Sequence, residues 1–203
     1  LLATWDTPGG EPAPAERLHG YLLKAVREAK IRTTWTEQDA GYEKAVLDLA
    51  DRACAHPRVH ELINDFLTLT APLFRTVVLG QKLLQLTMPG VPDVYQGTEI
   101  VDLSLVDPDN RRPFDFDLRR RLLTRLDAGA RPTCLDEEKL LLTSRALRLR
   151  RDRPQAFVGD DCTYAPLPTT TELLVAYERG TTDDGPQVVA LVTRLQRTLD
   201  ELG

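Results

Sequence analysis

The sequence of 203 residues is long enough to bury a sizeable core, and its 42% hydrophobic and 28% charged residues are ordinary for a soluble globular protein. Its formal net charge of −5 argues against non-specific binding of nucleic acid, which requires clustered lysine and arginine. Three cysteines, far apart and without a CxxC pair, favour a reducing, cytoplasmic location and argue against a zinc knuckle.

The chain shows no sequence signal for a membrane. Its most apolar window, Leu67 to Leu86, is interrupted by a proline and by polar and charged residues, so we predict no membrane span. No basic region followed by an apolar core opens the chain, so no secretory signal is predicted. The first residue is Leu1 rather than methionine, which is compatible with a fragment.

The first half of the chain is predicted to be helical after a Pro- and Gly-rich loop at residues 7–15. Apolar residues recur at helical spacing over residues 16–30 and predict an amphipathic helix with one buried stripe. Thr36 followed by Asp39 predicts the N-terminus of a second helix, roughly residues 37–55, which ends before Pro57.

A third helical stretch begins near Val59, and Pro72 predicts a break and a fresh start within it. The run Val91 to Tyr95, bounded by glycines, predicts a short strand that enters a loop. Two further helices are expected at residues 117–129 and 136–151.

The composition changes near residue 155. Strand patterns at residues 163–167, 172–178 and 187–193 are separated by turn-rich segments and predict an antiparallel β domain. Three strands are few for a stable sandwich, so that domain is predicted to be incomplete. We therefore expect a domain boundary between residues 153 and 154.

Charged residues concentrate in the segment from Asp93 to Arg112, directly after the predicted strand. Carboxylate and amide side chains beside an aromatic residue are typical of sugar binding, and a neighbouring arginine can fix a carboxylate's orientation. The same residues could equally form a turn in which aspartates cap backbone amides and pair with arginines. Both interpretations remain open on the residues alone.

The stretch Gly90-Val-Pro-Asp-Val-Tyr-Gln-Gly-Thr-Glu99 resembles the eighth-strand motif G-x-P-x-x-Y-x-G-x-E of the alpha-amylase clan of glycosyl hydrolases. Its continuation, LSLVDPDNRRP at residues 103–113, resembles the maltooligosyltrehalose synthases much more specifically. Segments 24–43 and 188–195 are similar to that family as well, so the resemblance covers nearly the whole chain.

This resemblance implies an α/β fold followed by a β fold. Residues 1–153 would form the C-terminal part of a (β/α)8 barrel, with helices around its last strand, and residues 154–203 the start of an antiparallel β-sandwich. It implies an isomerase that converts the reducing-end α-1,4 bond of a maltodextrin to the α,α-1,1 bond of trehalose, without cofactor or metal. The implied partners are a maltooligosaccharide and, in the same pathway, a trehalose-releasing hydrolase, with no nucleic acid and no membrane.

The catalytic carboxylates of the family are expected upstream of this chain, so the isolated segment is predicted to be inactive. The resemblance places on the rim of the substrate site Tyr95, Gln96, Glu99, Asp107, Asn110, Arg111 and Arg112. Glu99 could instead cap backbone amides, and Tyr95 could fill the barrel interior. Trp35, between two helices, could stack on a glucose ring or plug a helix junction.

Two alternatives to this function remain. The chain could belong to another glucanotransferase or hydrolase of the alpha-amylase clan, which would differ in the loop after Glu99. It could also be a non-catalytic carbohydrate-binding module.

Overall fold

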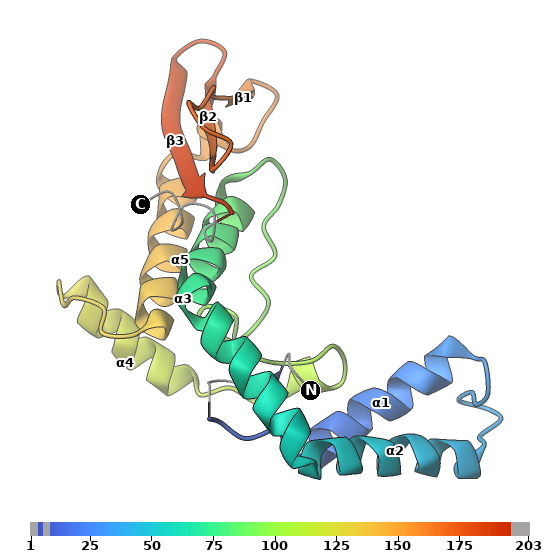
Figure 1. The fold of residues 1–203 in the computed structure, drawn as a ribbon. Helices are drawn as coiled ribbons and strands as arrows, with labels where there is room; N and C mark the ends of the chain where they lie inside the picture. The colour runs from blue at the N-terminus through green and yellow to red at the C-terminus, as the bar shows by residue number, and fades with distance from the viewer. Residues whose placement is uncertain (1–3, 6–8, 196–203) are drawn as a thin grey trace. The chain divides into compact units, whose positions relative to one another are not determined.

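The computed structural model describes residues 4–5 and 9–195, which contain five α-helices and one three-stranded sheet (Figure 1). They form two compact units, unit 1 within residues 1–72 and 102–113, and unit 2 within residues 73–101 and 114–203. The domain boundary predicted between residues 153 and 154 is a different subdivision and stays a prediction.

Unit 1 begins with two helices close to their predicted positions. Helix α1 spans Ala15–Ala29 and ends at Lys30, which adopts a left-handed conformation with φ 56°. Helix α2 spans Ala40–Ala55, and its N-cap is Asp39, whose carboxylate accepts a hydrogen bond from the Tyr42 amide at 2.9 Å. The predicted start near Thr36 is therefore wrong, because Thr36 lies in the preceding turn and the aspartate makes the capping bond.

Helix α3 spans Pro57–Thr87 without interruption, so the break predicted at Pro72 is wrong. A proline inside a helix lacks one amide donor and its ring crowds the carbonyl four residues earlier, but the other hydrogen bonds of this 31-residue helix hold it together across Pro72. Pro57 occupies the first helical turn, where no donor is needed. The division between the two units falls within α3, since Pro72 belongs to unit 1 and Leu73 to unit 2.

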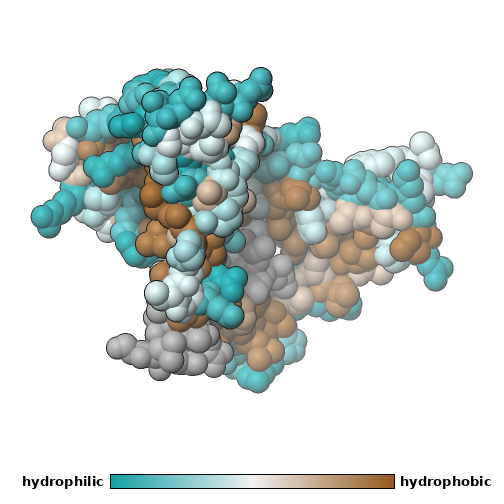
Figure 2. Space-filling view, turned by 90° about the horizontal axis from the view of Figure 1, so that it is seen from above, coloured by the Kyte–Doolittle hydropathy of each residue, from teal (hydrophilic) through white to brown (hydrophobic). Residues whose placement is uncertain are grey.

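Helix α3 is long and apolar enough to cross a membrane by length and composition alone, a test that core helices of soluble proteins also pass, so the absence of a membrane span stays a prediction. Several of its large apolar side chains are exposed, with Leu62 at 52% and Leu69 at 65%. Hydrophobic residues reach the surface in other parts of the chain too (Figure 2).

Unit 2 contains helix α4, Phe116–Asp127, and helix α5, Leu135–Asp152, both within three residues of their predicted bounds. Asp115 caps α4 by accepting a hydrogen bond from the Leu118 amide at 2.7 Å. The two helices enclose a small core of Ile100, Leu126 and Leu140.

The sheet of unit 2 confirms the three predicted strands. Strands β1 (Cys162–Pro166), β2 (Leu174–Thr181) and β3 (Gly185–Thr193) pair antiparallel in the order β1-β2-β3. Register fixes Tyr177 opposite Ala190, and both side chains are buried.

The strand predicted over Val91 to Tyr95 is not formed: this segment has neither strand nor helix assignment, and Val91 is 96% exposed. A strand requires a neighbour to satisfy its backbone donors and acceptors, and the described residues supply none beside this segment.

Candidate functional site

A groove of about 510 Å³ lies in unit 1 between helix α1 and the segment 102–113. We call it the α1 groove. It is lined by Gly20, Leu23, Lys24, Arg27, Glu28, Trp35, Asp107, Pro108 and Arg111. Of the eight residues that the sequence nominated for a substrate site, three line it, although Trp35 is more than seventy positions from the other two.

Helix α1 supplies the charged wall of the groove. Lys24, Arg27 and Glu28 are spaced i, i+3 and i+4, which places them on one face of the helix. The Lys24 ammonium lies 3.9 Å from the Glu28 carboxylate and 3.8 Å from the Asp107 carboxylate. One cation thus links the helix to the opposite wall.

Asp107 and Arg111 form that opposite wall. The Arg111 guanidinium donates to the Asp107 carboxylate at 2.7 Å, and the side chain of Asp107 is 34% exposed. Both groups keep donors or acceptors open to the groove. A sugar hydroxyl can therefore bond to either of them without displacing a buried contact.

Asp109 anchors the loop that carries these residues. Its carboxylate receives two hydrogen bonds from Arg17, both at 2.8 Å, and one from the Leu105 amide at 2.8 Å. Arg17 also donates to the Leu103 carbonyl at 2.9 Å. Because Asp109 is only 5% exposed, it holds the loop onto α1 and is not available to a ligand.

The electrostatics of Asp109 follow from these bonds. The Arg17 guanidinium lowers the pKa of the Asp109 carboxyl from 3.8 to about 2, the opposing effect of burial being smaller. The pKa of Arg17 is correspondingly raised by the same hydrogen bonds. The pair is therefore ionised throughout the neutral range.

Arg112 bonds within the loop, and Asn110 is partly buried in it. Arg112 donates to the Asp109 carbonyl at 3.0 Å and to the Ser104 hydroxyl at 3.2 Å, although its side chain is 46% exposed. The Asn110 carbonyl oxygen is buried and has no hydrogen-bond partner among the described residues. Neither residue lines the groove, so the structure separates them from Asp107 and Arg111.

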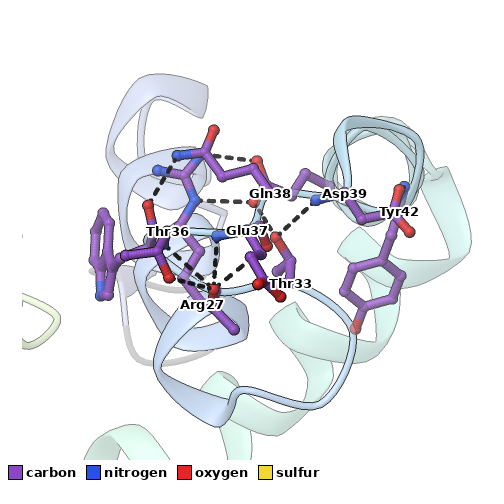
Figure 3. Close-up of polar contacts among 10 residues, drawn as sticks. Arg27, Thr33, Thr36, Glu37, Gln38, Asp39 and Tyr42 are labelled. Carbon is purple, nitrogen blue, oxygen red and sulfur yellow. Dashed lines mark hydrogen bonds and ion pairs between the residues drawn. The ribbon is translucent and has the colours of Figure 1, made fainter.

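Trp35 lies in the turn between α1 and α2, and Figure 3 shows the labelled residues Thr33, Thr36 and Glu37 of the same turn. The Thr34 amide donates to the Glu37 carbonyl, and the Glu37 amide donates to the Thr34 hydroxyl, each at 2.8 Å. The indole is 53% exposed, and the Arg27 guanidinium lies 5.1 Å from its ring centroid. Trp35 therefore does not plug a helix junction.

The remaining predicted residues, Tyr95, Gln96 and Glu99, belong to unit 2. Tyr95 and Gln96 are exposed at the start of a turn, in which the Thr98 amide donates to the Tyr95 carbonyl at 3.0 Å. Arg119 donates to the Glu99 carboxylate at 3.3 Å and to the Gly97 carbonyl at 2.9 Å. These bonds give Glu99 a structural contact in the turn.

Sequence reasoning missed Arg17 as an anchor and Lys24 and Glu28 as groove residues. Lys24 and Glu28 carried a usable signal, since their i, i+4 spacing lies within a segment that resembles the family. Arg17 carried none, because its partner Asp109 is 92 positions away.

The side chains of the α1 groove are suited to bind a polar ligand that carries many hydroxyl groups. Two carboxylates, two arginines and a lysine surround an exposed indole. No group of three metal-ligating side chains occurs within residues 4–5 and 9–195. The groove therefore offers hydrogen bonds and an aromatic surface, the two means by which proteins bind sugars.

No family model matches the sequence. It is 37% identical over 207 aligned residues to a Mycobacterium tuberculosis protein named as a maltooligosyl trehalose synthase, covering all of this chain and 25% of that protein. Among solved structures, maltooligosyltrehalose synthase from Arthrobacter ramosus matches with a TM-score of 0.77 at 44% identity, over 95% of this chain and 25% of that one. A hypothetical maltooligosyl trehalose synthase of Sulfolobus tokodaii matches with a TM-score of 0.66 at 29% identity, over 88% of this chain and 24% of its own. The chain spans about a quarter of the length of these relatives.

Proposed function

We infer that this chain is part of a maltooligosyltrehalose synthase. The inference is supported by similarity over the whole chain to proteins of that name and by similarity of fold. Since the relatives are about four times longer, the activity belongs to a larger enzyme of which this segment is one part.

The proposed reaction is an intramolecular transfer. The reducing-end glucose of a maltodextrin is detached from its α-1,4 link, stays bound, turns, and is joined again through its anomeric hydroxyl in an α,α-1,1 link. An aspartate nucleophile and a glutamic acid, both outside this segment, would form and resolve the glycosyl-enzyme intermediate. Water must be kept out, because it would otherwise hydrolyse that intermediate.

Within this reaction we assign to the α1 groove the binding of substrate hydroxyls. The observation that carries the assignment is the meeting of Trp35, Asp107 and Arg111 in one groove. The salt bridge between Asp107 and Arg111 fixes the orientation of both groups. Their remaining hydrogen-bond donors and acceptors therefore face a substrate hydroxyl in a defined direction.

The same inference extends to fold and setting. We propose that residues 1–153 belong to the end of a (β/α)8 barrel and residues 154–203 to a β-sandwich domain. The unpaired run Val91 to Tyr95 would find its strand neighbours in the rest of the barrel, and the exposed apolar residues of α3 would be covered there. The enzyme would be cytoplasmic and would pass its product to a trehalose-releasing hydrolase.

Counting reducing ends tests this proposal on the full-length enzyme with maltopentaose as substrate. Rearrangement removes the reducing end of each molecule and leaves its mass unchanged. A hydrolase of the same clan would instead create new reducing ends and shorter sugars, and a binding module would do neither. The isolated segment should show no turnover, because the proposed carboxylates lie outside it.

A further inference from the structure

We propose that Trp35 is a stacking platform for a pyranose ring in the α1 groove, and that Glu43 positions it through Arg27. This rests on the proposed function, because it names a specific contact for the substrate of that reaction. Neither Arg27 nor Glu43 is among the residues that the sequence nominated for the site.

The first observation is the exposure of the indole. Trp35 is 53% exposed, whereas Trp5, the other tryptophan of the chain, is 2% exposed. An indole in water loses the stabilisation that burial of such a large apolar surface would give. An exposed tryptophan in a groove lined by charged side chains is therefore well suited to contact a ligand.

The second observation is that the indole is held in place although it is exposed. The turn that carries it is closed by two hydrogen bonds between Thr34 and Glu37, one in each direction. Its end is fixed by the Asp39 amide, which donates to the Thr33 hydroxyl at 3.1 Å. A ligand that stacks on a fixed ring does not have to bear the cost of ordering it.

The third observation is the contact that Arg27 makes with one face of the ring, which leaves the other face for a ligand. The Arg27 guanidinium lies over the indole and donates two hydrogen bonds to Glu43, at 2.9 and 2.7 Å. Glu43 also accepts a hydrogen bond from the Thr33 hydroxyl at 2.6 Å and is 7% exposed. A buried carboxylate thus fixes the planar guanidinium, and the guanidinium fixes the ring.

Charge keeps this support intact across the working pH range. The hydrogen bonds from Arg27 and Thr33 lower the pKa of the Glu43 carboxyl to about 2, and those to Glu43 raise the pKa of Arg27. The guanidinium is therefore always available for its cation–π contact with the indole.

A pyranose ring matches the resulting surface. Its C–H face is apolar and packs on an aromatic ring, while its rim of hydroxyls needs donors and acceptors. The groove supplies these from Asp107 and Arg111 on one wall and from Lys24 and Glu28 on the other. The same groove thus offers a stacking surface and hydrogen-bonding groups.

Steady-state kinetics of trehalose formation from maltopentaose by the full-length enzyme tests the platform. We expect Trp35→Ala to raise KM about tenfold with kcat changed less than about twofold, because stacking away from the reacting bond contributes uniform binding. Trp35→Phe keeps an aromatic face and should restore KM to within about threefold. Tyr42→Ala is the matched control, because Tyr42 is an exposed aromatic residue of the same unit that does not line the groove.

A double-mutant cycle tests the role of Glu43. Glu43→Gln keeps the size of the side chain and removes its charge, so we expect it to raise KM in the same direction as Trp35→Ala. The double variant should be no worse than Trp35→Ala alone, because both changes remove the same contact. If Glu43 were merely structural, the effects of Glu43→Gln and Trp35→Ala on KM would add in the double variant. That result would overturn the assignment of Glu43 as a positioning residue.

The platform itself is contradicted if Trp35→Ala lowers the melting temperature and leaves KM unchanged. If the wild-type enzyme forms no trehalose, the proposed function fails instead. Calorimetric titration with maltopentaose then still tests the stacking role of Trp35. That role requires Trp35→Ala to raise the Kd for maltopentaose about tenfold.

Discussion

At the scale of single residues, two aspartates in one loop have opposite roles. Asp109 is 5% exposed and accepts two hydrogen bonds from Arg17 of α1 and one from the Leu105 amide of its own loop, whereas the side chain of Asp107 is 34% exposed at the groove. The aspartates are two positions apart and chemically identical. Their difference follows from which of them meets Arg17, so it is a property of the fold.

We expect Asp109→Asn to destabilise unit 1 by about 3 kcal/mol, because it leaves the partly buried Arg17 without its charged partner. Asp107→Asn in the same loop should cost less than about 1 kcal/mol, since its ion pairs are solvated. Chemical unfolding of the two variants measures the difference. Equal losses of stability would show that Asp109 is not the anchor.

The same carboxylate predicts a dependence of stability on pH. Its pKa is lowered in the folded state to about 2 from 3.8, so its contribution is complete above about pH 5 and is lost as the pH falls from about 4 towards 2. Unfolding measured against pH should therefore show a smaller acid loss in Asp109→Asn than in the wild type. Parallel curves for the two proteins would refute this linkage.

The sequence singled out this loop but did not assign a role to each of its residues. Charge density and turn residues singled out residues 107–112, while the alternatives of sugar contact and structural turn stayed open. The structure shows that Asp107 and Arg111 line the groove, whereas Asp109 bonds to α1 and to the Leu105 amide, and Arg112 bonds within the loop. Only the approach of α1, more than eighty residues earlier, makes that distinction. The sugar contact itself stays a prediction.

At the scale of elements, local sequence patterns predicted two kinds of element. These are helices, whose backbone hydrogen bonds lie within the helix, and strands that pair with the next strand along the chain. Residues 15–29 and the three strands of the sheet follow from periodicity and turn chemistry. The predictions were wrong where the rest of the fold decides the local structure and the sequence pattern does not. Helix α3 continues through Pro72, and the run Val91 to Tyr95 lacks a partner strand.

The turn after that run gives a sharp test at the element scale. Gly97 has φ +89°, and a Cβ there would lie 2.5 Å from the Phe114 ring. We expect Gly97→Ala to destabilise unit 2 by about 3–5 kcal/mol through backbone strain and steric overlap together.

Gly90 is the matched control for Gly97. Its φ of +107° is also positive, but a Cβ added there would meet nothing within 4 Å, so Gly90→Ala should cost only about 1–2 kcal/mol. Thermal unfolding compares the two variants. Similar losses would mean that Phe114 yields to the added methyl and does not fix the turn.

At the scale of the whole molecule, the chain spans about a quarter of the length of its relatives, and its exposed apolar side chains fit the proposal that it is part of a larger enzyme. Large apolar side chains such as Leu69, 65% exposed, and Val91, 96% exposed, are costly on a free surface. We expect them to be covered in the full-length protein. The lining residues of the α1 groove, in contrast, all belong to unit 1, at positions 20–35 and 107–111.

The assignment of the α1 groove to substrate binding is tested most directly by kcat/KM for trehalose formation from maltopentaose by the full-length enzyme carrying Asp107→Ala. We predict a fall equivalent to about 1–3 kcal/mol with an unchanged melting temperature, because a groove carboxylate would lose its bond to substrate. Asp117→Ala, which removes an exposed aspartate paired with Arg120 in unit 2, should leave the activity unchanged. An unchanged kcat/KM with a lowered melting temperature in Asp107→Ala would contradict the assignment of the groove to substrate.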